Sequence, residues 1–144
     1  MDFTVTLLVV AAAVLIDADG RVLVCQRSAA QSHPGKWEFP GGKVEAGETP
    51  EAALRRELWE ELNVEPCPTC LQPFSFASYP YPDFHLLMPL YLCRKWDGFV
   101  QAKEHQAVRW VWPDEVAGMD LVEADVELAR ELRDRLARGR RFAD

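Results

Sequence analysis

Apolar residues along the chain fall into short continuous runs and into two longer stretches with helical period. The runs predict strands over residues 4–16, 22–27, 37–39, 70–78, 85–94 and 108–112. A helix is predicted over residues 50–62, because Leu54, Leu58 and Leu62 recur every four residues. The apolar residues of the segment 122–138 have the same period and predict a last helix. Mixed strands with one middle and one terminal helix indicate an α/β layer fold.

The first apolar run, residues 5–16, has to be distinguished from a targeting or membrane segment. No Lys or Arg precedes it, and its twelve residues are too few to span a bilayer. The sequence Asp17-Ala18-Asp19-Gly20 then predicts a turn into the next strand. We therefore predict a buried strand, no membrane association and a cytoplasmic location.

The start of the helix over residues 50–62 is marked by three neighbouring residues. Thr49 is a good N-cap, and Pro50 suits the first helical position. The charge of Glu51 complements the positive end of the helix dipole. These residues predict a helix that begins close to Pro50.

Three prolines interrupt the middle of the chain. Pro80, Pro82 and Pro89 lack the backbone N–H that a sheet ladder uses. We therefore expect loops or sheet-edge positions at these residues.

Length and charge limit the classes of function. The chain has 144 residues, the size of one ordinary domain, and we predict a single domain over residues 1–144. Its net charge of -7 argues against binding a polynucleotide, which depends on basic patches. The sequence leaves open whether the protein is a monomer or a homodimer.

Four cysteines are present, and two of them form a Cys67-Pro68-Thr69-Cys70 segment. This spacing occurs in metal sites and in redox motifs, but a zinc site would need two further ligands, which no second pair of cysteines or histidines offers. We therefore expect structural or incidental thiols at residues 67 and 70. Cys25 and Cys93 lie in apolar, strand-like runs and are expected in the core.

Three carboxylates lie at helical spacing within the predicted middle helix. Glu57, Glu60 and Glu61 are placed i, i+3 and i+4, so they project from one side. A solvated acidic face is the alternative interpretation of such a pattern. Because like charges at this spacing repel, their clustering is explained if a hard divalent cation neutralises them, and Mg²⁺ fits oxygen ligands shared with phosphates.

A glycine-rich stretch precedes this helix. Pro40-Gly41-Gly42 and Gly47 allow the backbone to turn tightly and to approach a ligand closely. Lys43 can supply a point charge for a phosphate. Together with the carboxylates, this stretch predicts magnesium-assisted phosphate chemistry.

The glycines and carboxylates together resemble the Nudix box. In the box, a glycine is followed after five residues by a glutamate, and after seven more by Arg-Glu-aliphatic-x-Glu-Glu-x-Gly-aliphatic. The matching residues here are Gly42, Glu48, Arg56, Glu57, Leu58, Glu60, Glu61 and Val64. The late glycine of the box is Asn63 in this chain, and asparagine is the next best residue for a left-handed helix cap.

Residues 37–43 further resemble the MutT branch of the Nudix hydrolases, and the similarity covers about residues 5–132. This resemblance implies an α/β/α sandwich with a mixed β-sheet. It also implies hydrolysis of nucleoside triphosphates to the monophosphate and pyrophosphate, with Mg²⁺ as cofactor and Mn²⁺ as an alternative ion.

The resemblance also implies roles for the acidic residues. Glu57 would be the general base, and Glu60, Glu61, Glu104 and the Gly41 carbonyl would bind the metal ion. Glu57 is a metal-ligand candidate as well, because the division of roles among the glutamates stays open. Arg56 would orient the acidic cluster by ion pairing, and Glu48 would hold the preceding loop. A solvated loop carboxylate is the alternative for Glu104.

Substrate contacts are implied at five positions. Arg27 and Lys43 would bind phosphates, although Arg27 could equally be a surface charge at the end of a strand. Phe39 and Tyr81 would line the base pocket, and Asp125 would hydrogen-bond the base edge. MutT proteins that select 8-oxo-dGTP have an asparagine at the place aligned with Asp125, so cytosine recognition and an exposed helix residue are alternatives.

Three functions follow as hypotheses. The first is an 8-oxo-dGTP diphosphatase that sanitises the nucleotide pool and so protects DNA replication and repair. The second is a pyrophosphohydrolase of CTP or modified dCTP. The third is a non-catalytic Nudix-fold binding module, against which the retained Arg56, Glu57, Glu60 and Glu61 argue.

Overall fold

The computed structural model describes residues 4–103 and 107–143. In chain order the elements are β1 (Leu7–Leu15), β2 (Val22–Gln26), β3 (Trp37–Glu38), β4 (Gly41–Lys43), α1 (Pro50–Leu62), β5 (Glu65–Pro66), β6 (Gln72–Pro80), β7 (His85–Cys93), β8 (Trp96–Asp97), β9 (Ala107–Val111), α2 (Pro113–Val116), the 3-10 turn η1 (Glu123–Asp125) and α3 (Val126–Ala143).

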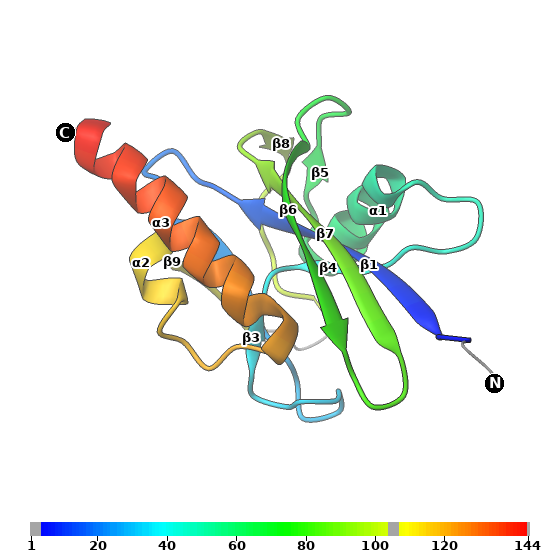
Figure 1. Ribbon diagram of the computed structural model, residues 1–144. Helices are drawn as coiled ribbons and strands as arrows, with labels where there is room; N and C mark the ends of the chain where they lie inside the picture. The colour runs from blue at the N-terminus through cyan, green and yellow to red at the C-terminus, as the bar shows by residue number, and fades with distance from the viewer. Residues whose placement is uncertain (1–3, 104–106, 144) are drawn as a thin grey trace.

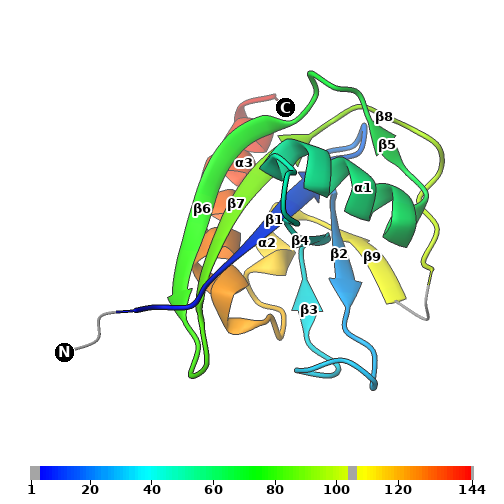
Figure 2. The ribbon, with the colours of Figure 1, turned by 90° about the vertical axis from the view of Figure 1, so that its right-hand side faces the viewer.

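A mixed sheet with the strand order β4-β1-β7-β6 forms the middle of the molecule. β1 runs parallel to β7, whereas β4 and β6 are antiparallel to their neighbours. An antiparallel sheet of order β3-β2-β9 and a two-stranded ribbon of β5 and β8 complete the strands of the described residues. In Figures 1 and 2, α1 covers one side of the central sheet and α3 the other. The expected α/β/α sandwich with a mixed sheet is confirmed.

Two hydrophobic clusters lie on opposite faces of β1. Ala11, Ala13 and Leu15 belong to the cluster that includes the buried leucines of α1. The alternate residues of β1 belong to the cluster that includes Leu128 and Leu132 of α3. Because β1 is buried on both faces, its sequence is almost continuously apolar, and the predicted buried strand is confirmed.

The ends of α1 follow the expected capping chemistry. The backbone N–H of Ala52 donates to Thr49 Oγ1 at 3.1 Å, and Pro50 opens the helix. Asn63 adopts a left-handed conformation with φ of 62° and closes it. Leu54, Leu58 and Leu62 are all fully buried, which confirms the apolar stripe.

The last helix begins later than the segment 122–138 suggested. η1 precedes α3 because the chain is tied to β3 at this point: Trp37 donates its N–H to the Asp120 carbonyl at 2.8 Å, and Val122 donates to the Trp37 carbonyl at 3.0 Å. These contacts override the helical period. The two- and three-residue strands β4, β5 and β8 were not predicted, because such short segments carry no periodic signal.

Pro80 ends the edge strand β6 as expected, and Pro82 lies in the following loop. The prediction for Pro89 is wrong, because it lies inside β7, between β1 and β6. The β1–β7 pairing passes from Val9↔Leu87 to Ala12↔Leu90. Pro89 therefore falls in the gap of this ladder, where no partner in β1 requires its missing N–H.

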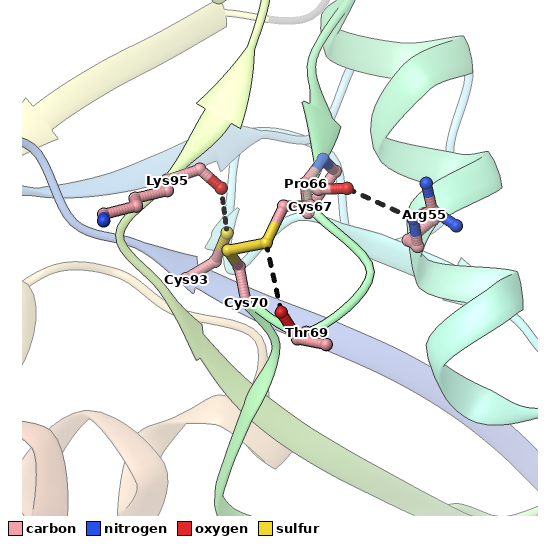
Figure 3. Close-up of a disulfide and its surroundings, with 7 residues drawn as sticks. All are labelled: Arg55, Pro66, Cys67, Thr69, Cys70, Cys93 and Lys95. Atoms are coloured by element: carbon pink, nitrogen blue, oxygen red, sulfur yellow. Dashed lines mark hydrogen bonds between the residues drawn. A yellow bond between two sulfur atoms is a disulfide. The ribbon is translucent and has the colours of Figure 1, made fainter.

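Cys67 and Cys70 form a disulfide in the connection between β5 and β6 (Figure 3). The expectation of free thiols at these residues is therefore wrong, since the tight turn brings the two Cα atoms to 5.1 Å. Cys25 and Cys93 are free and buried, as predicted.

Among residues 4–103 and 107–143, no helix combines the length and apolar character that crossing a membrane requires.

Candidate active site

Gly41 and Gly42 let three elements pack closely at the centre of the site. They lie in β4, so the expectation of a tight turn here is wrong, while Gly47 with φ of 82° does make a turn. A Cβ atom on Gly41 would lie 2.0 Å from the Ala11 carbonyl oxygen of β1. A Cβ atom on Gly42 would lie 2.2 Å from Cδ of Glu57. Both positions therefore require glycine for close approach.

Arg56 joins the loop before α1 to the carboxylates on the helix. Its Nε and Nη2 donate to the two carboxylate oxygens of Glu48 at 2.8 and 2.9 Å. Its Nη1 donates to Glu57 Oε1 at 2.8 Å and to Glu60 Oε2 at 3.4 Å. This geometry matches the orienting role that the resemblance implied for Arg56.

Glu48 holds the loop in the expected manner. Hydrogen bonds from Arg56, followed in size by the bond from the Glu45 N–H, lower the pKa of Glu48 to about 2. The hydrogen bonds to Glu48 and then to Glu57 raise the pKa of the Arg56 guanidinium. Glu48 therefore remains ionised and paired through the physiological pH range.

The three helix carboxylates differ in exposure. The side chain of Glu57 is 17% exposed and lies against Gly42, whereas that of Glu60 is 55% exposed. Glu61 is half-buried. Within the described part of the chain, no three Asp, Glu, His or Cys side chains gather closely enough to hold a metal ion. The carboxylate oxygens nevertheless have the chemistry that Mg²⁺ prefers.

The segment that leads to residue 104 docks on the C-terminal turn of α1. Gln101 donates its N–H to the Leu62 carbonyl at 2.9 Å, and Lys103 donates to the Glu61 carbonyl at 3.1 Å. The Lys103 ammonium also lies over the Trp59 ring, 5.5 Å from its centroid. Lys103 is thus fixed beside Glu61. Glu104 lies outside the described residues.

A pocket of about 550 Å³ opens beside the glycine strand. Six residues that the resemblance placed near metal or substrate line it, whereas Arg56, Glu57, Glu60 and Glu61 lie on α1 and do not. The six are Arg27, Phe39, Gly41, Lys43, Tyr81 and Asp125.

Asp125 is a buried charged residue of the pocket wall. It is 2% exposed, and its Oδ2 accepts the Phe39 backbone N–H at 3.0 Å. Burial raises the pKa of Asp125 to about 7, with the Phe39 bond acting in the opposite direction. The alternative of an exposed helix residue is therefore wrong. A carboxyl with this pKa is present in both protonation states near neutral pH.

Arg27 is half-buried and is held by an ion pair. Its Nη1 donates to both oxygens of Glu38 at 2.6 and 2.9 Å, and its Nε donates to the Ser32 carbonyl. Arg27 thus stands at the end of β2, as the alternative of a strand-end charge had it, but its charge is paired. Lys43 by contrast is exposed, and among the described residues its ammonium has no ion-pair partner.

Comparison with known proteins agrees with this geometry. The family model of the NUDIX domain matches residues 6–135. The chain belongs to the Nudix family. It is a MutT-type Nudix hydrolase, an enzyme, with the α/β fold of that family.

Two relatives of this Nudix hydrolase come from Escherichia coli K12. An 8-oxo-dGTP diphosphatase is 36% identical over 102 residues, covering 71% of this chain and 78% of the relative. A CTP pyrophosphohydrolase is also 36% identical, over 126 residues, covering 81% of this chain and 84% of the relative.

Solved structures show the same likeness. The solution structure of the Escherichia coli ORF135 protein superposes with a TM-score of 0.79 at 33% identity and covers 97% of this chain and 96% of that one. A MutT structure from a study of the Aliivibrio salmonicida and Vibrio cholerae proteins gives 0.77 at 28% identity, with 90% and 99% covered. Nudix hydrolases generally use divalent metal ions such as Mg²⁺.

Several pocket residues of this Nudix hydrolase were not predicted. Glu38 pairs with Arg27, and burial raises its pKa. His33 and Phe84 extend the aromatic wall around Tyr81, whose ring lies 6.0 Å from His33 and 5.1 Å from Phe84. Glu38 lies between Trp37 and Phe39, so a charge within an apolar strand was the signal that could have identified it.

Proposed function

We propose that this enzyme hydrolyses nucleoside triphosphates to the monophosphate and pyrophosphate, with 8-oxo-dGTP as the preferred substrate. The observation that carries the proposal is the position of Gly42, which lines the nucleotide-sized pocket and packs directly on Glu57. A base in the pocket would thus place its phosphates beside the acidic face of α1. The diphosphatase from Escherichia coli supports this substrate class.

We assign five groups to Mg²⁺: the carboxylates of Glu57, Glu60, Glu61 and Glu104 and the carbonyl of Gly41. Their fit rests on oxygen donors and on the space that Gly42 leaves at Glu57. When bound, the ion supplies positive charge to the phosphates and orients the attacking water.

Glu57 is the residue we assign as general base. Its carboxylate is partly buried and is held by Arg56 through one oxygen, Oε1. A general base must first be held within reach of the water that it deprotonates, and its pKa is the second requirement. Arg56 therefore acts as a positioning residue, because it aligns Glu57 and Glu48 with one guanidinium.

Phosphate binding falls to Lys43 and Arg27 in this proposal. Lys43 is exposed at the pocket and has no ion-pair partner among the described side chains, so its charge is available to a triphosphate. Arg27 is already neutralised by Glu38. We expect Lys43 to contribute more to triphosphate affinity than Arg27 does.

Asp125 is the residue we assign to base recognition. A neutral carboxyl both donates and accepts a hydrogen bond, as an asparagine amide does. Because its pKa is raised, Asp125 can be neutral and can then act as an asparagine would. It would bind a purine edge that offers an N–H donor and a carbonyl acceptor, as the edge of 8-oxoguanine does. Phe39 and the Tyr81 ring would pack against the base.

A pyrimidine substrate, CTP or modified dCTP, is the second candidate. The ionised form of Asp125 only accepts hydrogen bonds, which suits the amino group of cytosine. The similarity to the CTP pyrophosphohydrolase extends over more of this chain than the similarity to the diphosphatase.

A triphosphate panel decides between these substrates. The measurement is pyrophosphate release with Mg²⁺ from 8-oxo-dGTP, dGTP, CTP and an oxidised dCTP, each repeated after chelation. We expect the highest kcat/KM for 8-oxo-dGTP and no release after chelation. Equal values for 8-oxo-dGTP and dGTP would reject the first candidate, and a preference for CTP would establish the second. If no substrate released pyrophosphate, the non-catalytic binding module would be the remaining hypothesis.

We further propose that residues 1–144 act as one Nudix domain in the cytoplasm. The family match over residues 6–135 supports the single domain. We expect a monomer or a homodimer, which the mass of the particle in solution would show.

A further inference from the structure

The segment from Cys67 to Cys70 lies outside the nucleotide pocket and has chemistry of its own. It follows β5, which Arg55 of α1 holds by donating from Nε to the Pro66 carbonyl at 3.2 Å (Figure 3). The Cys70 N–H donates to the Cys67 carbonyl at 3.0 Å, so the backbone closes this turn as well as the disulfide does. An opened disulfide would leave the turn in place, and both oxidation states therefore fit here.

Both cysteines of the pair are half-buried, and Cys70 borders a hollow on the surface. This hollow measures about 530 Å³ and lies between the turn and the end of β7. Thr69, Leu71 and Arg94 line the same hollow, and Thr69 is exposed. A thiol from solution can therefore approach the Cys70 sulfur.

The charge around the hollow favours a thiolate. Arg94 and Lys95 both line it and are exposed, and within the described part of the chain neither forms an ion pair. In Figure 3 the Lys95 ammonium points away from the sulfur atoms, so it acts through its field rather than by contact. Neighbouring cations attract an incoming thiolate and stabilise the one that forms.

Thr69 lies where the leaving thiolate would form. Its hydroxyl oxygen is 3.6 Å from Cys67 Sγ, and a disulfide sulfur can only accept, so the hydroxyl is the donor (Figure 3). A hydrogen bond to the sulfur stabilises Cys67 as a leaving thiolate more than it stabilises the neutral disulfide.

The other cysteines do not share these features. Cys25 and Cys93 are buried in the core, and burial raises the pKa of both thiols. Such thiols are inert toward reagents in solution.

We propose that Cys67 and Cys70 form a redox-exchange site that takes thiols or dithiols of the thioredoxin class as its co-reactants. The incoming thiolate attacks Cys70 Sγ, the S–S bond breaks, and Cys67 leaves as a thiolate that takes up a proton. The second thiol of the reductant then attacks its own sulfur in the mixed disulfide and releases Cys70. One protein disulfide becomes two thiols, and the reductant becomes a disulfide.

The first test is native alkylation after equilibration in glutathione buffers of increasing reduced fraction, read by peptide mass spectrometry. We expect Cys67 and Cys70 to gain label together, while Cys25 and Cys93 stay unlabelled without denaturant. A disulfide that persists in fully reduced glutathione would be a structural staple and would overturn the proposal. Two separate free thiols in the oxidised buffer would also overturn it.

The second test identifies the attacked sulfur by acid-quenching the reaction of the oxidised protein with reduced glutathione and mapping the mixed disulfide by peptide mass spectrometry. We expect glutathione on Cys70 and a free thiol on Cys67. Glutathione mainly on Cys67, or equally on both residues, would contradict the assignment. Arg94→Gln in the same assay should slow formation of the mixed disulfide several-fold at low salt, and an unchanged rate would rule out the electrostatic contribution.

Discussion

Asp125→Asn changes the charge of the pocket wall while keeping its shape. The asparagine carbonyl can still accept the Phe39 N–H that now binds Asp125 Oδ2. The carboxylate that burial penalises is removed. The substitution therefore isolates the cost of an ionised group at a site that is 2% exposed.

The size and sign of the effect follow from the pKa of Asp125. The pKa rises from 3.8 in the unfolded chain to about 7 in the folded protein. Below pH 3.8 both states hold the proton and the group contributes nothing. As pH rises from 3.8 to 7, only the unfolded state releases it, so the folded wild type loses stability. At about 1.4 kcal/mol per pKa unit, the loss above pH 7 reaches about 2 to 4 kcal/mol after allowance for relaxation.

Urea unfolding at pH 4 and pH 8 measures this difference. We expect Asp125→Asn to match the wild type near pH 4 and to exceed its unfolding free energy by about 2 to 4 kcal/mol at pH 8. Glu123→Gln in the same turn is the control, because the Glu123 pKa is lowered and no such gain is expected. A variant that is equally stable or less stable than the wild type at both pH values would show that burial does not penalise the Asp125 carboxylate.

Three further predictions concern packing and phosphate binding. Leu58→Ala should lower the unfolding free energy by about 2 to 5 kcal/mol, since Leu58 is fully buried. Leu7→Ala, at a site that is 56% exposed, should lower it far less. Equal melting temperatures of the two variants would contradict the placement of Leu58 in the core. Gly42→Ala should displace Glu57 and lower kcat more than about tenfold in steady-state kinetics while the fold persists. Gly118→Ala is the control and should leave kcat unchanged, because its added Cβ meets only an ordinary 3.6 Å contact. Lys43→Gln should raise KM with little effect on kcat. An unchanged KM would show that Lys43 does not bind the phosphates.

The sequence predicted those parts of the fold that local patterns encode. The stripe of Leu54, Leu58 and Leu62 and the caps at Thr49 and Asn63 specify α1 without reference to other elements. The box motif led to the pairing of Arg56 with its carboxylates, because that geometry is local to α1 and the loop before it.

The unpredicted parts depend on contacts between distant segments. Arg27 meets Glu38 only because β2 and β3 pair with Cys25 opposite Glu38. Asp125 is buried because η1 is tied to β3 and the Phe39 N–H approaches it. Spacing likewise could not separate thiols from the Cys67–Cys70 disulfide, since that depends on the turn that brings the residues together.

In the proposed function, Glu57 lies against the glycine strand and activates water for metal-dependent cleavage of a nucleoside triphosphate. The most direct test of this role is the kcat of Mg²⁺-dependent pyrophosphate release by the wild type and by Glu57→Gln, measured with 8-oxo-dGTP at saturation. We expect a loss of at least about 100-fold with an unchanged melting temperature. Turnover within a few-fold of the wild type would contradict it.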